Sequence, residues 1–169
     1  MPHPPAWFER TFAFGYPVEL LPNLLARLRG TPARLEDLLA PASASALHFR
    51  ADEAWSAQEN AGHLLDLEPL WLARVEDFVR GAAELTPTDL QNRRTFDAHH
   101  NDRPLAALLS DFRAARERLL ARVAELSPEA FTRAIPHPRL HTPMLLTDHL
   151  FFVAEHDDHH LARIWTLLH

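Results

Sequence analysis

Apolar residues recur every three or four positions along four stretches of the chain, which is the spacing of α-helices that bury one face. The clearest stretch covers residues 104–126, whose ionisable residues are predicted to form a solvated face. Its apolar positions are Leu105, Leu108, Leu109, Phe112, Leu119, Leu120 and Val123. A leucine stripe predicts another helix over residues 17–29, ended by Gly30. Thr31 and Pro32 then form a cap-and-proline pair that predicts a short separate helical piece, followed by a loop over residues 41–54.

The other two helices carry clearer signals at their ends. Ser56 and Glu59 form a capping-box pattern, and the helix that they open is predicted to extend to residue 80, with a kink near Pro69. Thr142 and Pro143 predict the cap of the last helix. That helix is predicted to continue without a break, because neither Gly nor Pro occurs from residue 144 onward. These two helices are therefore the longest that the sequence predicts.

Four helical blocks without any alternating apolar run of strand length predict an all-α four-helix bundle, with an up-down-down-up arrangement or a close relative of it. A chain of 169 residues suits one domain over residues 1–169. Within it, residues 1–16 form an N-terminal extension, and residues 82–103 form a long connection between the second and third helices. A connection of that length without a clear period is often functional or covers an opening.

Composition narrows the possible chemistry. The chain has no cysteine, and its 17 basic residues are all arginine, which excludes thiolate ligands, cysteine nucleophiles and lysine chemistry. A formal net charge of −6 without a basic run argues against nucleic acid as a partner. We expect no signal peptide in residues 1–17, and no apolar run is long enough to span a membrane. We therefore expect a cytoplasmic protein that acts on a small molecule.

Histidines supply the candidate chemistry. His156 and His160 lie about 40° apart on the predicted last helix, in the same sector as the apolar Val153 and Ile164, so both rings are expected to face the core. His63 shares an apolar face of the second predicted helix. Three inward imidazoles could hold a divalent metal and leave one or two positions open for water or substrate. Candidate groups to orient the rings are Glu59, Asn60, Asp66, Glu155 and Asp157.

Other interpretations of these residues remain open. With 12 histidines in the chain, a pair at this spacing can arise by chance. Asp157 stands where a zinc protease has Glu, and no Glu-x-x-His pair of a di-iron bundle is present. His149 either lines the pocket or is a core histidine, and His159 is expected to be partly exposed. The loop histidines are expected to be solvated, and they are His99, His100, His137 and His141.

Large side chains on these faces carry alternatives too. Arg74 and Arg163 lie on otherwise apolar faces, where each is either a buried or snorkelling structural arginine or a clamp for an anion at the pocket mouth. Trp55 and Trp71 are interpreted as core residues.

Three segments resemble the DinB-like (DinB/YfiT-like) family. Residues 55–68, WSAQENAGHLLDLE, are similar to its second-helix signature, and residues 154–164, AEHDDHHLARI, to its last-helix signature. Residues 137–144, HPRLHTPM, resemble the segment that leads into that last helix. The similarity extends from about residue 20 to residue 164. It implies a four-helix bundle, often a homodimer, with zinc or nickel held by His63, His156 and His160.

The resemblance also frames the function. Characterised relatives include transferases and isomerases that depend on a low-molecular-weight thiol, and others are described as metal-dependent hydrolases. The favoured hypothesis is a metal-dependent enzyme that activates water or such a thiol for attack on a small electrophile. The alternative is a non-catalytic stress-response bundle that binds a metal or ligand and acts through a partner. The residues do not reveal the substrate, and three imidazoles suit several metals.

Overall fold

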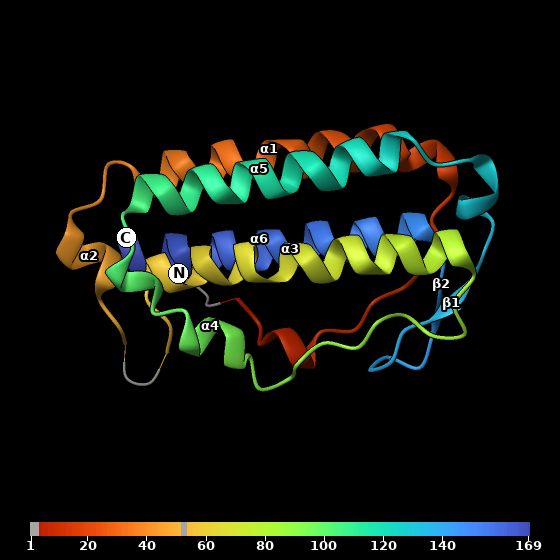
Figure 1. The fold of residues 1–169 in the computed structure, drawn as a ribbon. Helices are drawn as coiled ribbons and strands as arrows, with labels where there is room; N and C mark the ends of the chain where they lie inside the picture. Colours follow the sequence, from red (N-terminus) through yellow and green to blue (C-terminus); the bar gives the residue numbers. More distant parts are fainter. Residues whose placement is uncertain (1–3, 52–53) are drawn as a thin grey trace.

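A computed structural model describes residues 4–51 and 54–169, and four long helices dominate it (Figure 1). They are α1 (Leu21–Leu39), α3 (Ala57–Arg80), α5 (Leu105–Ala124) and α6 (Leu146–Leu168). The shorter elements are the helices α2 (Ala44–His48) and α4 (Arg93–Asp97), the 3-10 turns η1 (Trp7–Glu9), η2 (Val18–Leu20), η3 (His100–Asp102) and η4 (Pro128–Phe131), and the strands β1 (Ile135–Pro136) and β2 (Pro143–Met144). The predicted all-α bundle is confirmed, and no described helix is long and apolar enough to cross a membrane.

The direction of each long helix follows from the colours of Figure 1. Helices α1 and α6 run one way along the bundle, and α3 and α5 run the other way, which is the predicted up-down-down-up arrangement. Helix α3 packs against α5 and α6, and α1 packs against the same two helices from the other side. The metal-site prediction needs α3 and α6 to be neighbours, and they are.

This topology explains the long connection between α3 and α5. Because the two helices are parallel, the chain must return along the whole length of the bundle before α5 can begin. Residues 82–104 make this return along one face, with α4 and η3 on the way, and the N-terminal segment lies along the same face (Figure 1). The N-terminal segment is fastened to α6, since the backbone N–H groups of Gly15 and Tyr16 donate to one oxygen of Asp148 at 2.8 and 2.9 Å.

The core is divided by a buried polar layer. Apolar residues of all four long helices form one cluster around Leu28, Phe78 and Val153 and a second around Leu64 and Phe112. Between the two levels lie four buried polar side chains, one from each long helix, and they are Thr31, Glu68, Arg116 and Asp157. The guanidinium of Arg116 donates to Glu68 and Asp157, with shortest N–O distances of 2.6 Å to each. The expected solvated face of α5 is therefore wrong at Arg116, which is 1% exposed.

The same layer corrects the predicted break in the first helix. Helix α1 continues through Gly30 and Pro32 as one unit, although a proline leaves the carbonyl four residues earlier without its helical donor. That carbonyl belongs to Leu28, and Arg116 donates to it at 3.1 Å. The Thr31 hydroxyl, predicted to cap a new helix, instead donates to Asp157 at 2.8 Å. These contacts with distant residues thus keep α1 continuous where the local sequence predicts a break.

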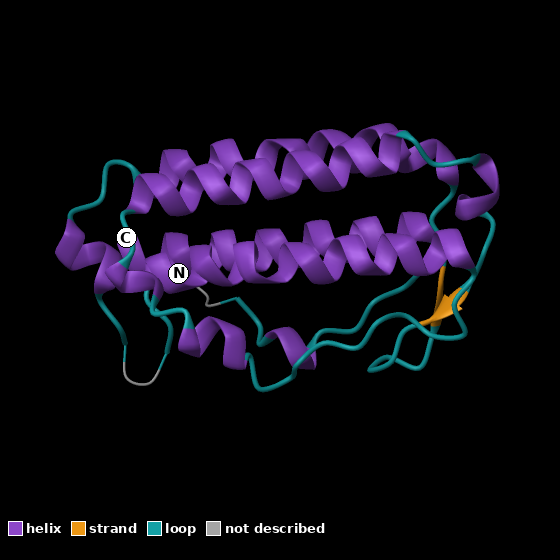
Figure 2. Ribbon diagram, in the orientation of Figure 1, coloured by secondary structure: helices purple, strands orange, loops and turns teal. Residues whose placement is uncertain are grey.

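Smaller predictions also need correction. The predicted loop over residues 41–54 contains α2, and the last helix begins after Leu145 rather than at Thr142. Pro143 instead belongs to β2, which pairs antiparallel with β1 (Figure 2). The capping box at Ser56 and Glu59 is present as predicted, and Gly81 ends α3 in the left-handed conformation.

One close approach in the bundle gives a test of its packing. A Cβ atom on Gly62 of α3 would lie 2.1 Å from Cγ of the buried His100, whose Nε2 contacts Asp66 at 2.8 Å. We expect Gly62→Ala to lower the free energy of unfolding by about 1–3 kcal/mol, because the ring must shift. The matched control is Gly30→Ala in α1, where a Cβ meets nothing within 4 Å. This substitution should raise the free energy of unfolding by about 0.5–1 kcal/mol. Urea unfolding measures both, and equal effects would contradict the packing.

Candidate metal centre

Three histidines from two neighbouring helices meet at one point. His63 of α3 and His156 and His160 of α6 each offer a ring nitrogen, and these nitrogens all lie within 4.8 Å of one another. Metal–imidazole bonds of 2.0–2.1 Å let one ion join nitrogens at most about 4.2 Å apart. The upper limit of 4.8 Å is close to that span, and small ring rotations would bring any longer separation within it. The structure thus brings these three side chains together, as the sequence predicts.

Hydrogen bonds to the ring nitrogens favour metal binding. Asn60 uses its amide N–H groups on the carbonyls of Trp55 and Ser56, so its oxygen is left to accept from Nδ1 of His160 at 2.8 Å. A proton on Nδ1 leaves the lone pair on Nε2, the nitrogen that can ligate. Nδ1 of His63 lies 3.0 Å from the hydroxyl of Thr95, whose oxygen is able to accept a hydrogen bond from it.

The ring of His156 and the protonation states of all three histidines also favour metal binding. Nδ1 of His156 is buried and meets no hydrogen-bond partner among the described residues, a costly situation unless another group uses the ring. Burial lowers the pKa of His63 to about 4 and lowers the pKa values of His156 and His160 well below the ordinary range. All three rings are therefore neutral near pH 7, as ligation requires. The donor set fits a divalent transition metal.

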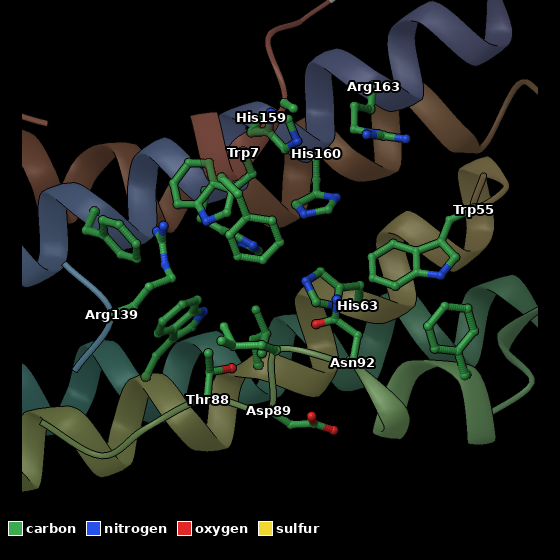
Figure 3. Close-up of a pocket in the computed structure, with 18 of the residues that line it drawn as sticks. Trp7, Trp55, His63, Thr88, Asp89, Asn92, Arg139, His159, His160 and Arg163 are labelled. Atoms are coloured by element: carbon green, nitrogen blue, oxygen red, sulfur yellow. The ribbon is translucent and has the colours of Figure 1, made fainter. Parts of the chain in front are cut away.

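The three rings form part of the wall of a cavity of about 360 Å³, shown in Figure 3. Its walls are mostly aromatic. The indole of Trp7 meets the ring of His156 edge-on with 4.9 Å between centroids, and that of Trp55 lies 4.6 Å from the ring of His63. Trp71, 5.6 Å from His156, completes this wall. Such a lining excludes water around the histidines and suits a small, partly apolar ligand.

Sequence reasoning missed several of these residues. Trp7 belongs to the expected N-terminal extension, and Thr95 to the long connection, which also contributes Thr88 and Asn92 to the cavity wall. The length of the connection was the one signal that could have pointed to its residues, and no sequence signal pointed to Trp7. Trp55 and Trp71, interpreted as core residues, also line the cavity.

The expected partners of the histidine rings are only partly correct. Asn60 does hold a ring, that of His160. The four carboxylates are engaged elsewhere: Glu59 with Arg50, Asp66 with His100, Glu155 with Arg10 and Arg27, and Asp157 with Arg116. These four carboxylates of α3 and α6 therefore stabilise the fold and do not orient the histidine rings of the centre.

The other histidines named in the sequence analysis lie in the core, on the cavity wall or at the surface. His149 is fully buried against Trp71 and Phe78, so its role is in the core. His159 is 6% exposed and lines the cavity, which corrects its expected exposure. The loop histidines His100 and His137 are buried rather than solvated, at 1% and 2% exposure. His99 and His141 are exposed as predicted.

Arg74 and Arg163, for which the sequence allowed two roles, both line the cavity. Arg74 is buried, and its Nε donates to the carbonyl of Thr86 at 2.8 Å while one terminal nitrogen lies 3.1 Å from Nε2 of His137. Arg163 lies near His160 in Figure 3. A third arginine, Arg139, joins them from the segment before β2. The cavity therefore combines a metal-competent centre with positive charge.

Solved structures with the same fold include YfiT from Bacillus subtilis, described as a probable metal-dependent hydrolase with an unusual four-helix bundle topology. It superposes with a TM-score of 0.81 at 20% identity, over 94% of this chain and 91% of that one. A mycothiol-dependent maleylpyruvate isomerase superposes with a TM-score of 0.65 at 13% identity, over 84% of this chain. The chain spans 58% of the length of the isomerase.

At these identities the structural likenesses show a shared fold. No curated protein matches the sequence. The sequence model of the DinB superfamily matches residues 27–164, a range that contains all three histidines of the centre and the four long helices except the first residues of α1 and the last of α6. The chain belongs to the DinB superfamily.

Proposed function

We propose that the protein is a metal-dependent enzyme whose zinc or nickel ion is held by His63, His156 and His160. The ion would activate a water molecule or a low-molecular-weight thiol for attack on a small electrophilic substrate. The observation that carries the proposal is the convergence of three neutral imidazoles on the wall of a cavity large enough for such a substrate. Three protein ligands are what catalytic sites use when a further position stays open.

The residues around the centre have definite tasks in this proposal. A divalent ion supplies Lewis acidity and lowers the pKa of a ligated nucleophile. Asn60 and Thr95 fix the orientation of two rings through their Nδ1 atoms, which keeps the ligating nitrogens aimed at one point. Trp7 and Trp55 shield the centre from bulk water and strengthen the electrostatic interactions within it.

The fold relatives support the choice of chemistry. One is described as a probable metal-dependent hydrolase and another as a mycothiol-dependent isomerase, so both water and a thiol remain candidate nucleophiles. A homodimer, a cytoplasmic location and a small-molecule partner are further predictions of the same proposal. The competing hypothesis is a non-catalytic bundle that binds a metal or ligand and acts through a partner.

Metal analysis of untagged protein is the first test. We expect near-stoichiometric zinc or nickel in the wild type and its loss in His63→Ala, because two imidazoles hold such ions far less firmly than three. The matched control is His141→Ala, which removes an exposed histidine outside the cavity and should keep the metal. No transition metal after reconstitution of the wild type would contradict the proposal.

Stability separates the enzyme from the competing hypothesis. If the ion is catalytic, His63→Ala should remain folded with a modest change in thermal midpoint, because four packed helices hold the chain without it. A structural ion contributes directly to folding, and its loss should lower the midpoint steeply. A steep loss would favour the non-catalytic bundle.

A further inference from the structure

The wall of the cavity beside Trp71 has hydrogen-bond donors that nothing satisfies. Nε1 of Trp71, one terminal nitrogen of Arg74 and one of Arg139 are each buried and have no hydrogen-bond partner among the described residues. All three side chains line the cavity that contains the histidines. Buried donors without partners are costly, and three of them along one wall indicate a place built for an acceptor that the protein itself does not supply.

His137 increases the excess of donors. A terminal nitrogen of Arg74 faces its Nε2 at 3.1 Å, while the backbone N–H groups of Arg139 and Leu140 face its Nδ1 at 3.2 and 3.3 Å. A neutral imidazole accepts at one nitrogen only, so the ring cannot satisfy both sides. Burial, with Arg74 and Arg139 nearby, lowers the pKa of His137 to about 3 and keeps the ring uncharged.

Charge in this region points to an anion. Arginine stays cationic at neutral pH, and Arg74 is 1% exposed without a carboxylate hydrogen-bonded to it. The nearest acid that affects it is Asp77, whose oxygens already accept from Arg80 and from the backbone N–H of Thr86. Asp89, on the cavity wall, accepts from backbone N–H groups of its own turn. Three arginines line the cavity against this one engaged carboxylate, so positive charge is in excess there among the described residues.

We propose that Trp71, Arg74 and Arg139 form a subsite for a carboxylate, so that the substrate is a small carboxylic acid with an electrophilic centre elsewhere in the molecule. This inference rests on the proposed function, because it names the substrate class of the same cavity. A guanidinium matches the two oxygens of a carboxylate. The tryptophan and phenylalanine side chains of the cavity wall suit the apolar body of such an acid.

The position of the subsite links it to the metal centre. The Cζ atom of Arg74 lies 5.5 Å from the centroid of the Trp71 ring, and the ring of His156 lies 5.6 Å from that same ring. One small molecule can therefore reach both places. Arg139 is half-buried and comes from the turn between β1 and β2, so its guanidinium can rotate onto an arriving carboxylate. Figure 3 shows it on the side of the cavity away from Trp55.

Binding of 4-fluorobenzoate, followed by fluorine NMR, tests the subsite without requiring activity. We expect the neutral isostere 4-fluorobenzamide to bind about tenfold or more weakly, since a charge-assisted hydrogen bond is lost. Arg74→Gln and Arg139→Gln should each weaken benzoate binding by a similar factor. The matched control is Arg118→Gln on the exposed face of α5, which makes the same change in net charge and should bind as the wild type does.

Other arms of the experiment can overturn the proposal. Equal binding of acid and amide, no binding of the acid at its highest soluble concentration, or displacement by inorganic phosphate but not by benzoate would each do so. A loss confined to Arg163→Gln would place the anion elsewhere and overturn it too. If Arg74→Gln fails to fold, Arg139→Gln and Trp71→Phe decide, because the latter removes the indole N–H while keeping an aromatic ring.

The metal must be varied separately, so that the two proposals can fail independently. Binding is measured in chelator-treated and in zinc-loaded protein. Dependence on Arg74 in both forms supports the subsite, even if metal analysis later rejects the proposed function. Binding that needs zinc and ignores Arg74 would mean that the carboxylate ligates the ion, and this result would overturn the subsite while leaving the metal centre intact.

Discussion

Replacing Arg116 by Met is expected to lower the free energy of unfolding by roughly 3–5 kcal/mol, the loss that follows when one partner of a buried ion pair is removed. The guanidinium lies between Glu68 and Asp157 and also serves the carbonyl that Pro32 leaves free. Although burial alone lowers its pKa, the Asp157 and Glu68 carboxylates raise it above the usual range. Urea unfolding at neutral pH measures the loss.

The matched control for this variant is Arg118→Met, which removes an exposed charge two residues away on the same helix. It should change stability by no more than about 0.5 kcal/mol. If the missing cation is the cause, adding Glu68→Gln and Asp157→Asn to Arg116→Met should restore part of the loss. Similar small effects for Arg116→Met and Arg118→Met would show that the buried layer contributes little.

Replacing His149 by Phe should flatten the dependence of stability on pH. Burial lowers the pKa of His149 from 6.5 to about 3, so the unfolded chain binds a proton below pH 6.5 that the folded chain refuses. Its contribution to stability is therefore present above pH 6.5 and is lost as pH falls toward 3. The loss approaches about 1.36 kcal/mol per pH unit, or roughly 2–3 kcal/mol between pH 6.5 and 4.5.

Urea unfolding of chelator-treated wild type and His149→Phe across this pH range gives the comparison. The two proteins should differ little near pH 7.5, because Phe fills a similar volume between Trp71 and Phe78. Below about pH 6 the curves should separate, with the variant losing less stability per pH unit. Parallel curves at all pH values would contradict a buried, neutral His149.

Much of the fold follows from local patterns. The capping box at Ser56, the left-handed Gly81 and the uninterrupted last helix are local features, and the bundle that they predict is present. The break at Thr31 and Pro32 was wrong because its outcome depends on Arg116, which lies far away in sequence. A local rule for proline holds only where no distant side chain takes up the freed carbonyl.

The metal centre likewise contains some residues that the sequence predicts and others that it does not. His63, His156 and His160 could be predicted to meet, since helical spacing fixes their faces and the bundle makes α3 and α6 neighbours. Thr95 and Trp7 could not, because they lie on irregular segments whose path depends on the whole bundle. Arg139 was missed as a cavity residue for the same reason: its place is set by the pairing of β1 with β2. Periodicity identifies the ligands but not the walls.

Three of the four tryptophans of the chain stand around the histidines. Trp55 lies 4.6 Å from the ring of His63, and Trp7 and Trp71 lie 4.9 and 5.6 Å from that of His156. The fourth, Trp165, is 45% exposed and stacks on His169. The molecule thus carries its own optical sensor: paramagnetic nickel would quench the ultraviolet emission of these indoles and closed-shell zinc would not, without any dye attached.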